Sequence, residues 1–284
     1  MPKALTMAIL HPGQMGAVLG SQARRAGIDV VWLGEGRSRA TRERASAAGL
    51  RDLGDMNELA EQSDLIVAVC PPDAAEEVAA AVVKSGFSGI YVEANPIRPQ
   101  RSRRIAEMLA ETGCTVLDGC VIGPAELGAG GLRVYLSGEA GAAALVSATF
   151  GEMKLTVSSL GEEVGAASAL KLAYALSQKA GRSLAAVSYA LAERYAVGGE
   201  LRAEAESLRG NPLREPDYLP IAASRGWRWA AEMEEIHETL TDADLPDGLP
   251  LAAAEVFACW NGFKDRDDVD LTSVLGSLGH DAGR

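Results

Sequence analysis

Short apolar runs alternate with amphipathic stretches along the first half of the chain. The runs are continuous and rich in β-branched residues, which is typical of strands buried on both faces of a sheet. These predicted strands cover residues 4–10, 28–33, 64–69, 89–94, 114–117 and 132–136. The predicted helices cover residues 17–26, 38–48, 56–62, 73–85, 99–112 and 140–150. Strands that alternate with helices predict an α/β fold with a mostly parallel, doubly wound sheet.

The second half of the chain has a different pattern. Strand signals stop after residue 161, and residues 164–196 carry a wide stripe of Ala, Leu and Val with helical period. This stretch predicts a helix roughly 50 Å long, at about 1.5 Å per residue. Further helices are predicted near residues 199–209, 227–240 and 249–262. We therefore expect an α/β domain over residues 1–162 and an all-α domain over residues 163–284, joined by the long helix.

The turn after the first strand is the first candidate site. A Gly-x-x-Gly turn that opens a helix aims free backbone N–H groups at an anion such as a pyrophosphate. The dinucleotide fingerprint of Rossmann-type domains has a glycine at the position that His11 occupies here. The alternative is an ordinary tight turn between strand and helix. The predicted cofactor-binding residues of this turn are His11, Pro12, Gly13, Gln14, Met15 and Gly16.

Charge and cysteine usage narrow the class of protein. The net charge of −12 and the pI of about 4.8 argue against a nucleic-acid partner, for which a basic patch is expected. The four cysteines have no metal-ligand or redox-motif spacing, which favours free thiols in a reducing compartment. We expect no metal site, no signal peptide before the first strand and no membrane helix. A cytoplasmic protein is the resulting expectation.

The segment after the second strand bears on the choice of dinucleotide. An acidic residue there accepts the adenosine ribose hydroxyls of NAD, whereas arginine meets the 2′-phosphate of NADP. The chain offers Glu35 and also a stretch, Gly36-Arg37-Ser38, that is followed by Arg39. Arg37 and Arg39 predict a charge-assisted clamp on phosphate, so NADP(H) is favoured and NAD(H) is the second option. The alternative is a solvated helix start with surface arginines.

Five motifs occur in order along the chain. They are the turn at residues 11–16, Val-Cys-Pro-Pro at 69–72, Tyr-Val-Glu-Ala-Asn at 91–95, Asp-Gly-Cys-Val-Ile-Gly-Pro at 118–124 and Gly-Ala-Ala-Ser-Ala-Leu-Lys at 165–171. Together they resemble the β-hydroxyacid dehydrogenase and 6-phosphogluconate dehydrogenase-like superfamily. The helical remainder resembles the uncharacterised C-terminal domain of one branch. The resemblance implies a Rossmann-type NAD(P)-binding domain, a small-molecule substrate and a homodimer whose helical domain closes the neighbouring subunit's cleft.

The resemblance also implies a catalytic role for Lys171, at the start of the interdomain helix. A positioned ammonium stabilises the negative charge that grows on a carbonyl oxygen during hydride addition, and it delivers the proton. A structural or snorkelling lysine is the alternative. From the same motif, Ser168 is a candidate for substrate binding. Near the nicotinamide ribose, the resemblance implies a contact from Asn95; a turn asparagine before Pro96 is the alternative. Cys70, Pro71 and Pro72 are predicted to form a stiff wall beside the cofactor, with Cys70 as a small buried packing residue and not a nucleophile.

Two departures from the superfamily pattern affect the substrate. The asparagine that usually follows the lysine by four residues is Ala175 here, so Tyr174 or Gln178 is the candidate for a polar group on that face. The usual Ser-Gly-Gly loop is Ile122-Gly123-Pro124, which lacks the serine hydroxyl. A more apolar substrate, or one bound without a contact from that hydroxyl to a substrate carboxylate, is the resulting hypothesis.

In the helical half, Trp229 and Met233 have helical spacing, which favours packing in a core or dimer interface and makes them candidates for a substrate pocket. The sequence therefore predicts an NADP-dependent oxidoreductase that transfers hydride reversibly between the nicotinamide and a small ketone or aldehyde, or a β-hydroxyacid-like alcohol. An imine reductase on the same fold is one alternative. A non-catalytic NADP-binding sensor is the other.

Overall fold

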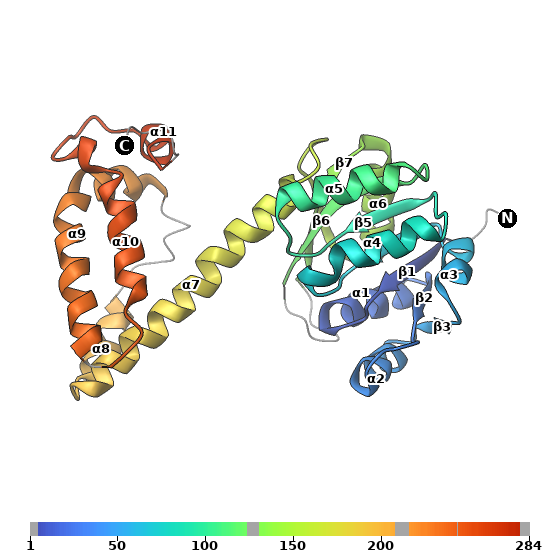
Figure 1. Cartoon of the computed structure of the whole chain (residues 1–284), viewed down its shortest axis with the longest axis horizontal. Coiled ribbons are helices and arrows are strands. Elements are labelled where there is room, and N and C mark those ends of the chain that lie inside the picture. Colours follow the sequence, from blue (N-terminus) through green and yellow to red (C-terminus); the bar gives the residue numbers. More distant parts are fainter. Residues whose placement is uncertain (1–4, 124–130, 208–215, 243, 279–284) are drawn as a thin grey trace. The chain divides into compact units, whose positions relative to one another are not determined.

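An eight-stranded sheet organises the first half of the molecule (Figure 1). The structure is a computed structural model, and it describes residues 5–123, 131–207, 216–242 and 244–278. The chain forms two compact units, a first unit over Met1–Ala175 and a second unit over Leu176–Arg284. The first unit thus includes the start of the long helix, whereas the domain boundary predicted from the sequence lies before that helix.

The strands follow the order β3-β2-β1-β4-β5-β6-β7-β8 across the sheet. Every neighbouring pair is parallel except β6 and β7, which confirms the mostly parallel, doubly wound sheet. The strands are β1 (Thr6–Leu10), β2 (Asp29–Leu33), β3 (Arg51–Leu53), β4 (Leu65–Ala68), β5 (Ile90–Glu93), β6 (Thr115–Ile122), β7 (Arg133–Gly138) and β8 (Thr156–Ser159).

The two edge strands, β3 and β8, are absent from the strands predicted from the sequence. In β3 only Leu53 is buried, and β8 has no buried residue. A strand at the edge of a sheet covers little apolar surface, so its sequence lacks the continuous apolar run that marks the central strands.

The helices of the first unit lie close to the predicted ranges. They are α1 (Gln14–Arg25), α2 (Arg39–Ala47), α3 (Met56–Gln62), α4 (Ala75–Lys84), α5 (Pro99–Ala110) and α6 (Ala140–Glu152), with a 3-10 turn η1 (Pro72–Ala74) before α4. The predicted long helix is α7 (Ala166–Arg194). Glu139 caps α6 by accepting the backbone N–H groups of Gly141 and Ala142.

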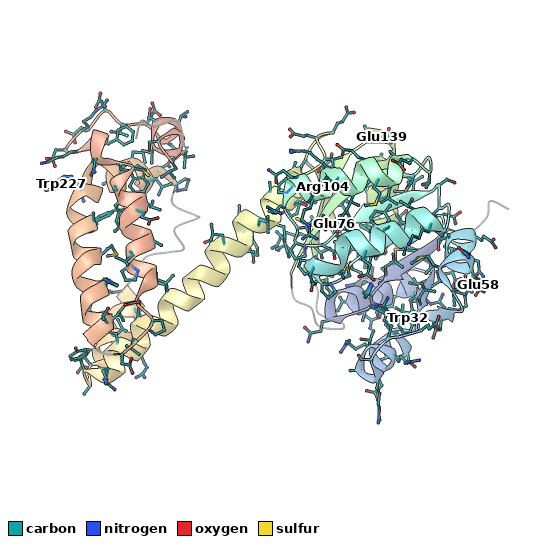
Figure 2. All side chains as sticks on the ribbon, in the orientation of Figure 1. Trp32, Glu58, Glu76, Arg104, Glu139 and Trp227 are labelled. Carbon is teal, nitrogen blue, oxygen red and sulfur yellow. The ribbon has the colours of Figure 1, made fainter. Side chains whose placement is uncertain are left out.

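Alternate residues of the central strands face two separate apolar layers. In β1, Met7 and Ile9 belong to the layer that α1 and α6 cover, whereas Ala8 and Leu10 belong to the layer that α4 and α5 cover. Helices on both faces bury the sheet, as the alternating pattern requires. Glu76 joins α4 to α5, because it accepts hydrogen bonds from Arg101 and from Arg104. Glu76 and Arg104 are labelled in Figure 2.

The second unit is helical. It contains α8 (Gly198–Ser207), α9 (Leu219–Asp242), α10 (Gly248–Ala258) and α11 (Leu271–Gly276), with 3-10 turns η3 (Pro216–Tyr218) and η4 (Asn261–Phe263). Helix α9 starts earlier than predicted, and Pro220 lies in its first turn. Proline is tolerated there because the backbone N–H groups of the first turn have no partner within the helix. Within the described part of the chain, no helix is long and apolar enough to cross a membrane.

Candidate functional site

The turn from β1 into α1 leaves a helix N-terminus open. Gly13 is the N-cap, no side chain caps the helix, and its first turn has no acidic residue. A Cβ atom at Gly16 would lie 3.0 Å from the carbonyl oxygen of His11 and 3.2 Å from Cγ2 of Ile9. Helix α1 therefore packs so closely on β1 that a larger residue than glycine would be crowded at this position. Uncapped amides at a helix N-terminus form an anion site.

A cavity of about 490 Å³ opens at this helix end. Three segments build its wall: the β1–α1 turn, the segment from the end of β2 into α2, and the end of β4. The structure thereby brings together residues from three separate predicted motifs. The lining residues are His11, Gly13, Gln14, Met15, Gly16, Gly36, Arg37, Ser38, Thr41, Arg44, Val69, Cys70 and Pro71.

Four predicted cofactor residues are outside this lining. Pro12 and Asn95 are buried, and Glu35 and Pro72 are exposed. Conversely, the cavity includes Thr41, Arg44 and Val69, which the sequence reasoning missed. Thr41 could have been found from the sequence, because a serine such as Ser38 is a preferred N-cap residue. Ser38 caps α2 and accepts the backbone N–H of Thr41, so the two side chains lie at the same helix end.

The arginines that line the cavity differ from the pair predicted to bind phosphate. Arg39 pairs with Glu43 at 2.7 Å, and its side chain is 93% exposed. Arg44 lines the cavity instead, beside Arg37. The Nε atoms of Arg37 and Arg44 are buried and have no hydrogen-bond partner within the described structure. Two guanidinium groups with unused donors therefore lie at the wall of this cavity.

A second cavity of about 300 Å³ adjoins the same residues. His11 and Arg37 line both cavities. The second cavity is mostly apolar, with Glu77 as its acidic member. Its remaining lining residues are Leu10, Leu33, Met56, Ala74, Val78 and Ala81. Side chains from β1, β2, α3, η1 and α4 meet there only through the tertiary fold, and no motif in the sequence marked them.

Asn95 joins the ends of β4 and β5. Its Oδ1 accepts the backbone N–H of Cys70 at 2.6 Å, and its Nδ2 donates to the Cys70 Sγ at 3.3 Å. Burial raises the pKa of Cys70 to about 12, so the thiol stays protonated and serves as a small buried packing residue, as expected. Contact between Asn95 and a nucleotide ribose stays a prediction.

Two contacts join β6 to the first turns of α7. Asp118 is fully buried and accepts the backbone N–H of Ser168 at 2.8 Å and its hydroxyl at 2.5 Å. Three residues later on each element, the Lys171 Nζ donates to the carbonyl oxygen of Val121 at 2.6 Å. Ser168 is itself fully buried, so its hydroxyl serves Asp118.

Two of the predicted substrate residues near Lys171 belong to a small apolar cluster. Ile122 is buried there with Cys120 and Ala167, and Tyr174 packs against them. Gly123 has φ +146 and a Cβ atom there would lie 2.9 Å from Leu132, so only glycine fits. Residues 124–130, which include Pro124, lie outside the described residues. Ala175 is half-buried in α7, where Gln178 also lies, with a side chain outside the described part.

The other two predicted substrate residues lie in α9. Trp229 packs edge-on against Phe257, with ring centroids 5.5 Å apart, as part of the apolar core of the second unit. Met233 is half-buried on the same helix. The packing role that the helical spacing favoured is therefore present for Trp229. A pocket role for either residue stays a prediction.

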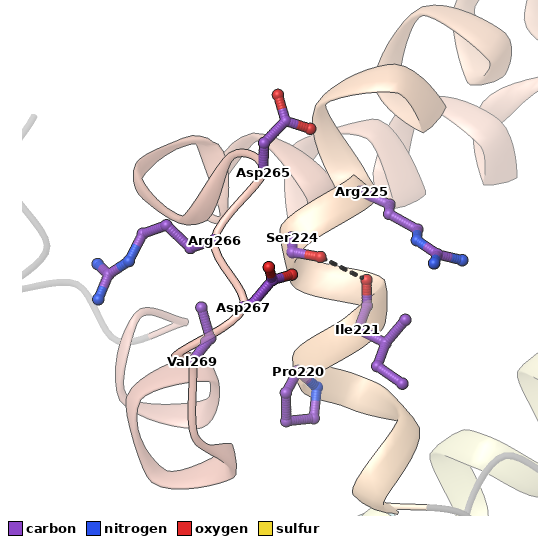
Figure 3. A pocket seen from close by; sticks show the side chains of 8 residues that line it. All are labelled: Pro220, Ile221, Ser224, Arg225, Asp265, Arg266, Asp267 and Val269. Carbon is purple, nitrogen blue, oxygen red and sulfur yellow. Dashed lines mark hydrogen bonds between the residues drawn. The ribbon is translucent and has the colours of Figure 1, made fainter.

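The second unit has a cavity of its own, of about 340 Å³ (Figure 3). It lies between α9 and the segment after η4, and Ser224 there donates to the carbonyl oxygen of Ile221. Arg266, which also lines it, pairs with Asp268. None of the predicted site residues lines this cavity. In the described ranges, no three His, Cys, Asp or Glu side chains are grouped to hold a metal ion.

These observations define the class of the protein as a dinucleotide-binding α/β domain followed by a helical unit. Residues 6–161 match the family model of the NAD binding domain of 6-phosphogluconate dehydrogenase, and the chain belongs to this family. Residues 192–260 match a second model, described as a domain of unknown function, DUF1932. Among curated proteins, none matches the sequence closely enough to count as a relative.

Solved structures share the fold over the whole chain. The imine reductase of Myxococcus stipitatus in complex with NADP+ superposes with a TM-score of 0.77 at 17% identity, covering 96% of this chain and 100% of that one. The imine reductase of Streptomyces aurantiacus superposes with a TM-score of 0.76 at 17% identity, covering 96% of this chain and 99% of that one. A conserved protein of unknown function, described as structurally similar to 3-hydroxyacid dehydrogenases, superposes with a TM-score of 0.58 at 23% identity, covering 91% of this chain and 98% of that one. At these identities the likeness establishes the fold, an NAD(P)-binding dehydrogenase or reductase fold.

Proposed function

We propose that this protein is an NADP(H)-dependent oxidoreductase that interconverts a C=O group and an alcohol, with Lys171 as the acid and base. The observation that carries the cofactor assignment is the cavity at the open end of α1, where Arg37 and Arg44 keep buried, unpartnered Nε donors. A pyrophosphate suits the uncapped amides of α1. A 2′-phosphate suits the two guanidinium groups and the hydroxyl of Ser38.

The second cavity fits the adenosine end of the same cofactor. It is lined mainly by aliphatic side chains, and it shares His11 and Arg37 with the first cavity. A flat aromatic base gains by leaving water in such an environment, and a guanidinium group stacks well on its face. Because Glu35 is exposed and outside both linings, the ribose contact that favours NAD has less support than the phosphate contact.

Lys171 supplies the proton in this proposal. When bound, a reduced nicotinamide supplies the hydride. The ammonium of Lys171 is held by the carbonyl oxygen of Val121, one residue before Ile122 in the predicted substrate segment. A held ammonium stabilises charge on the substrate oxygen and then transfers its proton there. Ser168 acts on Asp118 in this reading, so it positions α7 and does not touch the substrate.

The substrate is apolar close to its reacting carbon. Ile122 stands where the superfamily carries serine, and it lies in an apolar cluster with Cys120 and Tyr174. A substrate that relied on a carboxylate contact here would find no hydroxyl at this position. Small aliphatic or aromatic ketones and aldehydes are therefore the first class to test.

A C=N substrate is the second candidate, because solved structures named imine reductases match the fold over nearly the whole chain. The hydride chemistry is the same for both bonds. A matched panel of ketones and the corresponding cyclic imines separates the two. We also propose that the protein is a homodimer, as the superfamily resemblance implies.

Replacing Lys171 by alanine tests the catalytic assignment. We expect Lys171→Ala to lower kcat by about 10²- to 10⁴-fold, which is the usual contribution of a general acid. The dissociation constant for NADPH, measured by tryptophan fluorescence and calorimetry, should stay unchanged. Lys84→Ala, at an exposed lysine in α4, is the matched control and should leave both quantities unchanged.

Unchanged turnover in Lys171→Ala would contradict the role of the lysine. NADPH binding without turnover on either half of the panel, with Lys171→Ala silent, would favour a non-catalytic NADP-binding sensor. Failure of the wild type to bind NADPH or NADH would contradict the cofactor assignment itself.

A further inference from the structure

His11 is held in an uncommon backbone conformation at the point where β1 ends. Its φ is +62°, in the left-handed region that glycine adopts without steric cost. It also occupies the position where the dinucleotide fingerprint has its first glycine. The chain therefore keeps a strained histidine where glycine is the easier choice, and such strain at a ligand cavity points to a role for the side chain.

The side chain of His11 contacts Arg37. The Nδ1 atom of His11 lies 2.7 Å from NH1 of Arg37, which comes from the segment after β2. Burial and the nearby charge of Arg37 lower the pKa of His11 from 6.5 to about 4, so the imidazole is neutral at neutral pH. A guanidinium group can only donate, so Nδ1 is the acceptor and Nε2 carries the ring hydrogen.

Arg37 is otherwise held through its backbone. Its carbonyl oxygen accepts a hydrogen bond from Nε of Arg42 at 3.2 Å, and its N–H donates to the carbonyl oxygen of Gly34 at 3.2 Å. Among the hydrogen bonds found within the described residues, the one with His11 orients the guanidinium group. Both residues line both cavities, so this contact lies where the two cavities adjoin.

We propose that His11 is a positioning residue that sets dinucleotide preference, because it holds the Arg37 guanidinium between the two cavities to receive a 2′-phosphate. The inference rests on the proposed NADP(H) site. A long arginine side chain loses rotamer freedom when it binds phosphate, and a neutral acceptor that orients it in advance removes part of that cost. A protonated histidine would repel the arginine, so the neutral ring is the form that works.

His11→Gly separates this role from a structural one. Glycine removes the acceptor and relieves the left-handed backbone, so the melting temperature should not fall. We expect the dissociation constant for NADPH to rise about tenfold, as for the loss of an orienting charge-assisted contact, while that for NADH stays unchanged. His11→Asn should recover most of the NADPH affinity, because asparagine tolerates this conformation and its Oδ1 replaces Nδ1 as acceptor.

A double-mutant cycle with Arg37→Ala shows whether His11 acts through Arg37. We expect Arg37→Ala to weaken NADPH binding more than His11→Gly does, and His11→Gly to have no further effect in the Arg37→Ala background. Arg39→Ala is the matched control, since Arg39 is exposed and paired with Glu43, and it should leave both dissociation constants unchanged. All constants come from fluorescence and calorimetric titrations, which need no turnover.

The outcomes distinguish this inference from the proposed function. If the wild type binds neither dinucleotide, the proposed function fails. If Arg37→Ala weakens NADPH binding but His11→Gly is silent, only the positioning role of His11 is overturned. Equal weakening of NADPH and NADH by His11→Gly, or additive effects in the cycle, would also overturn it, because His11 would then act on the turn and not on Arg37.

Discussion

Two buried carboxyl groups on neighbouring strands have very different surroundings. Glu93 on β5 and Asp118 on β6 are register partners, and both are fully buried. Asp118 accepts hydrogen bonds from serine hydroxyls and backbone amides. Glu93 accepts the backbone N–H of Asn95 at 3.1 Å and a long hydrogen bond, 3.4 Å, from the Tyr91 hydroxyl. Burial raises the pKa of Glu93 from 4.5 to about 7, so the folded protein keeps this proton up to about pH 7.

This raised pKa predicts a stability that falls with rising pH. Between pH 4.5 and about 7 the unfolded chain releases the Glu93 proton while the folded protein keeps it, so the free energy of unfolding declines across that window. The decline is on the order of 3 kcal/mol. Glu93→Gln should remove it, as measured by urea unfolding at a series of pH values.

Glu61→Gln, at an exposed carboxyl, is the control and should keep the wild-type slope. A wild-type stability that is flat across the window would contradict the assignment. So would a slope that survives in Glu93→Gln.

At the scale of elements, the start of α7 depends on β6. Gly165 precedes the helix with φ +109, and its N–H also donates to Asp118, at 3.0 Å. A buried carboxylate at a helix N-terminus satisfies free amides and interacts favourably with the helix dipole. One turn later the Lys171 Nζ contacts the Val121 carbonyl oxygen. The strand therefore sets the position of the lysine through two contacts.

Asp118→Asn should disturb that position. The amide keeps the size of the side chain but loses an acceptor and the charge, so we expect about 1–3 kcal/mol lower stability by urea unfolding. If Lys171 is the proton donor, kcat should fall while the dissociation constant for NADPH changes little. Ser168→Ala should give the same pattern with a smaller loss of stability.

Asp217→Asn, at an exposed position in the second unit, is the control for both measurements. A variant that loses stability but keeps full kcat would show that Asp118 anchors the helix without positioning Lys171. A parallel loss of NADPH affinity would mean that the change spreads to the dinucleotide cavity.

At the scale of the whole molecule, the long helix carries apolar side chains that the described chain leaves in solvent. Leu176 is 70% exposed and Leu184 is 55% exposed, both on α7. Large exposed apolar residues on one helix are a usual mark of an interface between copies. This exposure supports the proposed homodimer.

Charged substitutions on α7 test the dimer. We expect the wild type to be dimeric by light scattering during size-exclusion chromatography. Leu176→Glu or Leu184→Glu should weaken the dimer by at least tenfold, because each copy loses roughly 1.5–3 kcal/mol of apolar burial. Leu145→Glu, at a leucine of similar exposure on α6, should leave the dimer intact. A monomeric wild type would contradict the proposal.

The class of fold follows from patterns within short stretches of the sequence. Residues 65–69 are apolar because β4 is covered on both faces, and residues 164–196 keep helical period through α7. Such patterns are local, since a segment's own residues record which faces it buries. The Gly13 turn, Lys171 and the superfamily resemblance could be found for the same reason, as each occupies a short stretch of chain. The short edge strands escaped because they bury almost nothing.

Which side chains meet depends on the folded chain. The fold pairs His11 with Arg37 and brings Arg44, in place of the predicted Arg39, to the cavity. It also directs the Ser168 hydroxyl to Asp118. These contacts join segments that lie far apart in the chain or depend on which face of a helix packs inward. Strand order, register and packing set them, and local periodicity carries no record of these long-range choices.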